Sequence, residues 1–300
     1  MKENDAYENE RIIKNLVSLR HSPVQGNYDV EHLKSVHERV FHGTSFSPGE
    51  FREELSNDKI WRKERVLSTQ KIDYNICYSS MDDDSRDLLT KTLSSINIKN
   101  LKTLDKNSFV NELSALYGKL DYIHPFKDGN SRTLREFTTQ IAKEAGYSVE
   151  WSKLQGQKDY ERLYRARDIE TTKINQLYQK NSEIKEYCSR LERYIDNGQG
   201  MSSILQEITR PERARSFEHD TREDAIKKHP ELKSAYTLKD KAAAYAAIQY
   251  DKRESREKFM ELMEKHIQEK LNNGETKDFK PTERQKETIR QKSERVERER

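Results

Sequence analysis

The 300-residue sequence contains only two cysteines, Cys77 and Cys188, which lie far apart along the chain. Neither belongs to a Cys-x-x-Cys or Cys/His pattern with the spacing that a zinc site needs. Two thiols in a chain of this length fit a reducing compartment, so we interpret both as ordinary thiols.

Long apolar runs are absent as well. Nowhere do about 18 apolar residues follow one another, which is the length needed to cross a bilayer. The opening MKENDAYENERIIKN also lacks the apolar segment of a signal peptide. We therefore expect a soluble, cytoplasmic protein without a membrane partner, although a signal read by a specialised secretion machine would escape this test.

A strong net charge is missing too. The formal charge of +3 comes from 56 basic and 53 acidic residues, so it gives no reason to expect a nucleic-acid partner. The charged residues are unevenly distributed, because about 45 of them fall in the last hundred residues. The hydrophobic core therefore lies upstream, and the end of the chain is expected to be solvated.

Helical periodicity dominates the rest of the sequence. Apolar residues recur at helical spacing in several segments, and good N-cap residues such as Asp29 precede them. The predicted helices cover about residues 29–41, 81–96, 107–123, 132–146, 157–169, 173–195 and 253–271. Branched and aromatic residues partly alternate only near 66–78, which predicts a short β-hairpin. The fold class is therefore mainly all-α.

Two clusters of possible metal ligands have simpler explanations. His32, His37 and His42 fall on different helix faces, so we expect solvated or core-edge histidines. The aspartates of MDDDSRDLL stand at a helix start, where negative charge is favourable, and this explains them better than a magnesium site does.

The segment Tyr122–Phe137 concentrates residue types that phosphate chemistry needs. The residues concerned are His124, Asp128, Gly129, Asn130, Arg132 and Arg135. A glycine before a helix can point backbone N–H groups at an anion, and the helix start adds its own N–H groups and positive dipole end. Two arginines three residues apart share a helix face and can pair with successive phosphates. A neutral imidazole can accept a proton from an alcohol.

On its residues alone, the same segment also fits a charged surface connection between two helices, in which the histidine has no catalytic role. However, HPFKDGNSRTLREF resembles the motif of the Fic (filamentation induced by cAMP) domain family, His-Pro-Phe-x-acid-Gly-Asn-Gly-Arg followed by a second arginine. GNYDVEHLKSVHERVF is similar to the opening helix of that family, and SPGEFR is similar to the segment that leads to its target-docking flap.

The resemblance implies a Fic-type helical core over residues 25–197, with a hairpin flap around Lys71–Tyr74 that aligns a target segment by strand addition. It leaves 1–24 as an N-terminal extension, 198–276 as a charged helical extension and 277–300 as a solvated or disordered tail. Gly198 to Gly200 mark the expected boundary.

The resemblance also implies a protein adenylyltransferase that moves AMP from Mg-ATP to a Ser, Thr or Tyr hydroxyl of a bacterial target, as a toxin-like or effector activity. In this assignment His124 is the general base, and Asp128 binds magnesium. Gly129 to Ser131 form the anion hole, and Arg132 and Arg135 hold the phosphates of ATP.

One position departs from the family pattern, because Ser131 stands where glycine is usual. The serine keeps its backbone N–H, but its Cβ narrows the anion hole. Kinase chemistry or transfer of another phosphate-linked group therefore stays open as an alternative to AMP transfer. A further alternative is a catalytically altered Fic scaffold that serves the charged C-terminal helices as an interaction protein.

Many Fic proteins carry an inhibitory helix with Ser/Thr, three residues, Glu and then Gly or Asn. The chain has no clean copy, since Ile208 breaks the pattern that begins at Ser203, and we predict a plain helix there. The resemblance then implies a separate small antitoxin-like protein whose glutamate pairs with Arg135.

Overall fold

The computed structural model describes residues 2–56, 59–277 and 279–298. The chain divides into two compact units. The first comprises the residues up to Ala145 together with Val149–Thr209, and the second comprises Gly146–Ser148 and the residues from Arg210 onward. Residues 1, 278, 299 and 300, which fall in the predicted N-terminal extension and tail, lie outside the described residues.

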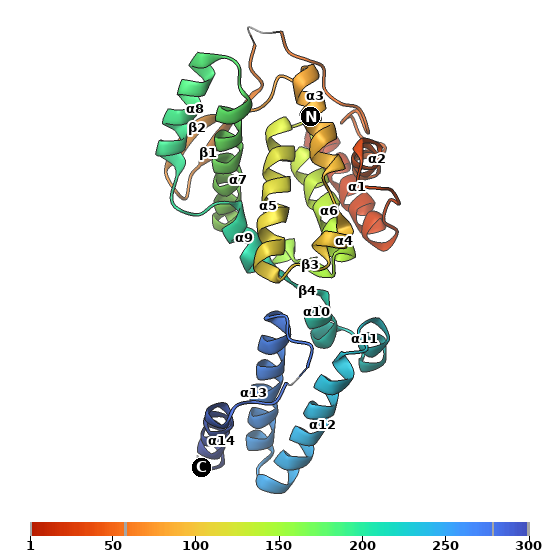
Figure 1. Ribbon diagram of the computed structural model, residues 1–300, viewed down its shortest axis with the longest axis vertical. Helices are drawn as coiled ribbons and strands as arrows, with labels where there is room; N and C mark the ends of the chain where they lie inside the picture. The colour runs from red at the N-terminus through yellow and green to blue at the C-terminus, as the bar shows by residue number, and fades with distance from the viewer. Residues whose placement is uncertain (1, 57–58, 278, 299–300) are drawn as a thin grey trace. The chain divides into compact units, whose positions relative to one another are not determined.

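The first unit is mainly helical, as predicted, and contains a hairpin (Figure 1). Its elements are α1 (Lys2–His21), α2 (Val30–Phe41), β1 (Arg62–Leu67), β2 (Ile72–Cys77), α3 (Asp83–Ser94), α4 (Ile98–Leu101), α5 (Lys106–Ile123), α6 (Asn130–Glu144), a 3-10 turn (Trp151–Lys153), α7 (Gly156–Tyr178), α8 (Ser182–Ile195) and α9 (Met201–Ile208). Figure 1 shows α5 and α6 between α1 and α2 on one side and α7, α8 and the hairpin on the other.

The central helices form for reasons visible in the sequence. Asp105 caps α5 by accepting from the backbone N–H groups of Asn107 and Ser108. Phe109, Leu113, Tyr117 and Leu120 then recur at helical spacing and are all buried. Helix α6 ends at Glu144, and Gly146 follows with φ +87°, a conformation that glycine adopts without strain. The predicted helices 107–123 and 132–146 are confirmed.

The predicted hairpin is confirmed, although its first strand begins earlier than expected. Strands β1 and β2 are antiparallel, with Arg62 opposite Cys77 and Leu67 opposite Ile72. One face of the hairpin packs on α7 and α8 through a buried cluster. Its members are Leu67, Tyr74, Ile76, Tyr78, Ile169, Leu191 and Ile195.

A buried ion pair fixes the hairpin to α7. The Arg65 guanidinium on β1 donates to both carboxylate oxygens of Asp168, at 2.7 and 3.0 Å, and the Tyr74 hydroxyl donates to the same carboxylate. The Asp168 side chain is fully buried. Burial and the neighbouring carboxylate raise the pKa of Tyr74, so its hydroxyl remains a donor.

One helix boundary differs from the expectation. The sequence predicts a break at about 170–172, but α7 continues from Gly156 to Tyr178. The residues of the expected break, including Thr171 and Thr172, are buried inside the unit, and packing overrides the modest helix propensity of threonine. The break comes instead at Asn181, whose side chain caps α8.

Helix α1 packs against the rest of the first unit, and its residues Ile12 and Leu19 are both buried. The Arg20 guanidinium donates to the carboxylate of Glu136 on α6, and Asn15 donates to the carbonyls of Val40 and His42 at the end of α2. Helix α1 is therefore linked directly to α6, the helix that begins within the HPFKDGNSR motif.

The strand pair β3 (Tyr147–Val149) and β4 (Thr209–Pro211) spans the boundary between the two units along the chain, because Val149 and Thr209 belong to the first unit. Among the described residues, the second unit is otherwise helical. The helices are α10 (Glu212–His219), α11 (Arg222–Lys228), α12 (Leu232–Gln249), α13 (Arg253–Asn272) and α14 (Glu283–Arg298). The predicted stripe on α13 is confirmed, because Phe259, Met263, Ile267 and Leu271 are buried. Ile289 of α14 packs in one buried cluster with Phe259 and Met263, whereas Ile267 and Leu271 belong to another. Among the described residues, none of the helices is long and apolar enough to cross a membrane.

The buried pair on the hairpin gives a first prediction. Replacing Asp168 with alanine leaves the Arg65 cation buried without its partner, so we expect a loss of about 3–5 kcal/mol in the free energy of unfolding. Urea unfolding measures the loss. Asp73→Ala is the control, because Asp73 is exposed on the same hairpin. Equal unfolding midpoints for the two variants would contradict the prediction.

Candidate functional site

His124 stands at the end of α5 in an unusual backbone conformation. Its φ of 50° and ψ of 58° are left-handed, and its N–H donates to the Leu120 carbonyl at 3.1 Å. This conformation costs a non-glycine residue about 1–2 kcal/mol, so neighbouring contacts must hold it. It turns the chain sharply after the helix and places the imidazole, which is 3% exposed, at the start of the motif loop.

A buried arginine supports this turn from below. Arg52, which is 5% exposed, donates through Nε to the His124 carbonyl at 2.7 Å. Its Nη2 donates to the carbonyls of Ser79 and Ile123. The guanidinium also lies 4.8 Å from the centre of the Trp61 ring. A planar donor group thus joins the end of α5 to the segment after β2, in place of the N–H groups that a continuing helix would supply.

The loop after His124 is closed by Asn130. The Phe126 N–H donates to the Asn130 side-chain oxygen at 3.0 Å, and the Asn130 amide donates back to the Phe126 carbonyl at 2.6 Å. An asparagine is suited to this role, because its amide supplies a donor and an acceptor together. The Asn130 side chain therefore shapes the loop.

His37 supports the same loop. Its burial differs from the expectation that the histidines of this region are solvated or at the edge of the core. It is fully buried and stacks on Phe126 with ring centroids 3.8 Å apart. Its Nε2 lies 3.1 Å from the Asp128 carbonyl oxygen, and its Nδ1 accepts from the Gly49 N–H. His32 is buried as well, whereas His42 is exposed. Burial follows from helix α2 packing this face against the loop.

Gly129 is the residue that the loop cannot replace. It has φ +76°, and a Cβ at this position would lie 2.3 Å from the Phe41 ring. Gly129 precedes α6 directly, so the first N–H groups of that helix are left without a side-chain cap. Such N–H groups and the positive end of the helix form a ready site for an anion.

All seven site residues predicted from the sequence line one cavity of about 410 Å³. They are His124, Asp128, Gly129, Asn130, Ser131, Arg132 and Arg135. Six further residues complete its wall, namely Lys63, Arg65, Tyr78, Tyr160, Tyr164 and Arg167. The cavity is therefore bounded by the loop, the start of α6, the first strand of the hairpin and one face of α7.

The cavity is rich in positive charge. Arg132 lies over the rings of Phe41 and Phe46, and Arg135 lies over Trp151. Aromatic faces hold a guanidinium without neutralising it. Within the described part of the chain, neither arginine forms an ion pair with a carboxylate, and burial lowers the pKa of Lys63 in the same wall. These groups favour an anionic ligand.

The imidazole of His124 is held in a defined orientation. Its Nδ1 lies 3.3 Å from the carbonyl oxygen of Asp121 and 3.8 Å from the carboxylate of that residue. Tyr78 packs on the ring with centroids 3.9 Å apart, and Nε2 has no hydrogen-bond partner among the residues described. Burial lowers the pKa of His124 to about 4, so the ring is neutral near pH 7. A neutral ring with Nδ1–H bound to the carbonyl leaves Nε2 free to accept a proton.

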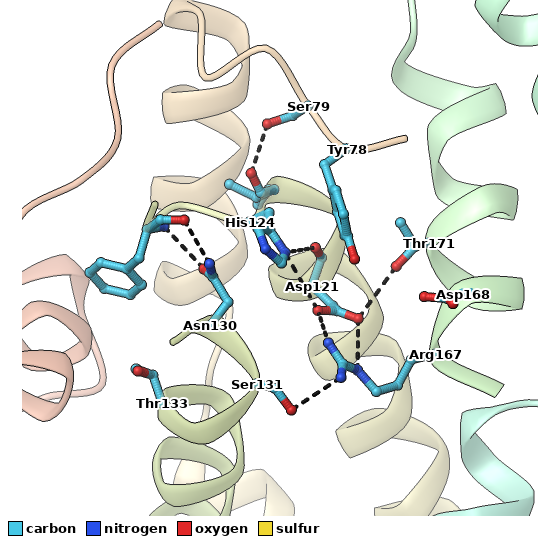
Figure 2. A network of polar contacts seen from close by, with 12 residues as sticks. Tyr78, Ser79, Asp121, His124, Asn130, Ser131, Thr133, Arg167, Asp168 and Thr171 are labelled. Carbon is cyan, nitrogen blue, oxygen red and sulfur yellow. Dashed lines mark hydrogen bonds and ion pairs between the residues drawn. The ribbon is translucent and has the colours of Figure 1, made fainter. Parts of the chain in front are cut away.

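A second buried ion pair lies beside the histidine (Figure 2). Arg167 of α7 donates to both carboxylate oxygens of Asp121, at 3.0 and 2.6 Å, and its Nη1 donates to the Ser131 hydroxyl at 3.1 Å. Burial alone would raise the pKa of the Asp121 carboxyl, but the Arg167 charge opposes this effect and holds that pKa well below its usual range. The pair connects α5, α6 and α7.

These supporting residues have only weak signals in the sequence. Asp121 precedes His124 by three positions, which places both on one helix face and could have suggested a contact. Arg52 lies in the SPGEFR segment but carries no pattern of its own. Arg167 has no local signal, because its role appears only when α7 packs beside α5.

Asp128 is the one carboxylate in the wall that is free of an ion pair within the described residues, and it is exposed. No group of three or more His, Cys, Asp or Glu side chains that could cage a metal occurs in the described ranges. Magnesium is often held by one or two carboxylates together with substrate phosphates. A single free carboxylate beside an anion cradle fits that mode of binding.

Within the described residues, a buried turn thus places a neutral histidine, the first N–H groups of α6 and two arginines without carboxylate partners around one cavity of a helical unit. Residues 27–142 match the model of the Fic/DOC family, so this stretch of the chain is similar to that family. The resemblance read from the sequence is thereby confirmed.

Curated relatives match part of the chain. The protein adenylyltransferase VbhT of Bartonella schoenbuchensis is 29% identical over 140 residues, which are 46% of this chain and 26% of the relative. A protein adenylyltransferase of Bartonella henselae is 26% identical, with 46% and 26% covered. A probable protein adenylyltransferase, y4lH, of Sinorhizobium fredii is 24% identical, with 47% and 66% covered. The match thus spans about a quarter of the two Bartonella relatives.

Solved structures are similar as well. The Fic domain of an effector protein from Bartonella sp. AR 15-3 has a TM-score of 0.49 and 23% identity, covering 70% of this chain and 84% of that one. BepC of Bartonella tribocorum, solved with bound AMPPNP, has a TM-score of 0.47 and 20% identity, covering 70% and 88%.

The close contact at Gly129 gives a prediction. We expect Gly129→Ala to lower the free energy of unfolding by about 2–5 kcal/mol, because the methyl group adds an overlap with Phe41 to the backbone strain. Gly146→Ala is the matched control: it also has positive φ, but a Cβ there meets nothing within 4 Å. We expect it to cost only about 1–2 kcal/mol. Equal costs in urea unfolding would refute the steric argument.

The buried histidines give a pH prediction. Burial lowers the pKa of His37 and His124 from 6.5 to about 4. Between these pH values the unfolded chain binds more protons than the folded protein, so stability rises with pH across this window and is lost as pH falls. In His37→Gln, the difference in unfolding free energy between about pH 4.5 and about pH 7 should shrink by about 2 kcal/mol.

Urea unfolding at a series of pH values measures this difference. His42→Gln is the control, because His42 is exposed and its replacement should leave the difference unchanged. An unchanged pH dependence in His37→Gln would show that His37 is not buried in its neutral form.

Proposed function

We propose that this chain transfers AMP from ATP to a Ser, Thr or Tyr hydroxyl of a target protein. The observation that carries the proposal is that a neutral imidazole with a free Nε2 and an anion cradle with two unpaired arginines line the same cavity. Two curated relatives that match this chain over 140 and 141 residues are named protein adenylyltransferases, which supports the proposal.

The phosphates of ATP would lie on the N–H groups at the start of α6. Arg132 and Arg135, one helical turn apart, would each contact a phosphate, and Lys63 would add positive charge from the hairpin. Tyr160 and Tyr164 of α7 supply aromatic surface at the edge of the same cavity, where a base can pack. Ser131 keeps its backbone N–H in the cradle, while its hydroxyl is occupied by Arg167.

In the transfer step the target oxygen attacks the α-phosphorus, and the bond from that phosphorus to the bridging oxygen of pyrophosphate breaks. His124 accepts the hydroxyl proton at Nε2, since Nδ1 is directed to the Asp121 carbonyl. Asp128 would hold magnesium together with the phosphates, and the metal would neutralise charge on their oxygens. The buried contacts of Arg52 and Asn130 keep base and cradle at a constant separation.

The hairpin is proposed to align the target. It has two strands, so each strand has an edge without a partner strand in this sheet, and an extended target segment can pair with such an edge. Lys63 and Arg65 of β1 line the cavity, and Tyr78, which follows β2, packs on His124. A segment paired with the hairpin would therefore present its hydroxyl beside the base.

A separate inhibitory protein is the remaining part of the proposal. Arg135 forms no ion pair with a carboxylate among the described residues, and its buried Nε has no hydrogen-bond partner there. A glutamate from an antitoxin-like protein would satisfy this arginine and block the phosphate site. Its identity can be sought among small proteins whose coexpression relieves toxicity.

Incubation of the protein with bacterial lysate and labelled ATP tests the transfer. Label from α-labelled ATP should enter protein bands, and label from γ-labelled ATP should not. His124→Ala should lower the rate by at least about 100-fold, because the general base is removed. His42→Ala serves as the control. Incorporation of γ label alone would replace the proposal with kinase chemistry, and no incorporation by a folded, ATP-binding protein would favour an interaction scaffold.

A further inference from the structure

Arg167 occupies a position from which it touches both halves of the site. It is 3% exposed, and Nε and Nη2 bind the two carboxylate oxygens of Asp121 while Nη1 binds the Ser131 hydroxyl (Figure 2). The two acceptors belong to different helices, α5 and α6. A guanidinium is planar and rigid, so the acceptors that it binds are held in a fixed relative geometry.

Each acceptor is adjacent to one functional part. Asp121 contacts the His124 ring, with its carbonyl oxygen at 3.3 Å and its carboxylate at 3.8 Å from Nδ1. Ser131 is the second residue of α6 and lines the cavity beside Arg132. Arg167 therefore stands between the base and the anion cradle, joined to each through one intermediate side chain.

The serine is essential to this connection. A glycine at position 131 would keep the backbone N–H of the cradle but would offer no acceptor to Arg167 Nη1. The departure from the usual motif glycine thus coincides with a hydrogen bond that only a side-chain oxygen can complete. The interaction also explains how the added Cβ and hydroxyl are accommodated, because the hydroxyl is directed to Arg167.

We propose that Arg167 is a positioning residue for the transfer reaction, which sets the separation between the His124 base and the Ser131 corner of the anion cradle, with the Ser131 hydroxyl as its second anchor. The inference rests on the proposed function. Arg167 acts through Asp121 and Ser131. A misplacement of the reacting groups by about 1 Å can cost about 100-fold in rate, so this separation matters to the chemistry.

A double-mutant cycle tests the proposal. Ser131→Ala removes the hydroxyl, and Arg167→Lys keeps a cation beside Asp121 but loses the planar geometry. Initial rates of label transfer from α-labelled ATP to total lysate protein give kcat and the KM for ATP. We expect each variant to lower kcat by about 10-fold or more with KM within about twofold. The double variant should be no slower than the slower single variant.

Two further variants sharpen the test. Ser131→Thr restores a hydroxyl and should recover most of the rate lost in Ser131→Ala. Arg165→Lys is the matched control on the same helix, because Arg165 binds the Ile195 carbonyl and Gln70, away from the cavity. Urea unfolding confirms that each protein is folded. If Arg167→Lys does not fold, the serine variants carry the test.

An independent measurement separates this inference from the proposed reaction. The nitrogen NMR signals of His124, assigned by their loss in His124→Asn, report which ring nitrogen carries the proton. We expect a single tautomer with Nδ1–H in the wild type and in Arg165→Lys, and a mixture in Ser131→Ala and Arg167→Lys. If the wild type transfers no label, the proposed function fails while this measurement still decides the positioning role.

Several results would overturn the inference. One is an unchanged kcat and tautomer in the folded variants, and another is an additive loss in the double variant. A loss confined to the KM for ATP would instead make Arg167 a ligand of the phosphates.

Discussion

The site depends on one backbone constraint, the left-handed turn of His124 at the end of α5. A non-glycine residue adopts this conformation only when the surrounding structure compensates for its cost. Here the compensation is a buried Arg52 that binds the carbonyls of the turn, together with the amide of Asn130 and the ring of His37, which close the loop behind it. The imidazole of His124 and the start of α6 keep a fixed relative position because these contacts over-determine the turn.

Buried charge is concentrated around this turn. Arg52 is satisfied by carbonyl oxygens, Asp121 and Arg167 form one ion pair, and Arg65 and Asp168 form another. Buried ion pairs add little net stability compared with apolar packing, but they are costly to break and demand fixed geometry. In this protein they join α5, the hairpin and α7, which are the elements that carry the proposed base, the proposed target edge and one wall of the cavity. The buried ion pairs therefore lie beside the cavity, where a fixed geometry of the side chains is needed.

The sequence was sufficient for elements whose signal is local. Periodic apolar residues in α5 and α13, the Asp29 cap of α2 and the alternation in β2 predicted those elements, and the motif predicted which residues would line the cavity. It was insufficient where the cause is tertiary. The continuity of α7 through Thr171, the burial of His37 and the partnership of Asp121 with Arg167 all depend on which helices become neighbours. The residue types at single positions do not indicate which helices will pack together.

The pairing of Asp121 with Arg167 also shows where the folding unit ends. The family match stops at residue 142, yet the guanidinium that neutralises Asp121 arrives 25 positions later (167 − 142), and Arg20, which neutralises the buried Glu136, precedes the match. A fragment trimmed to the matched residues would bury two carboxylates without counter-charges and would lose the helix against which the hairpin packs. The family match marks the residues that are similar in sequence. The smallest fragment of this chain that can hold the site in place is longer, because it must include the arginines that pair with the buried carboxylates.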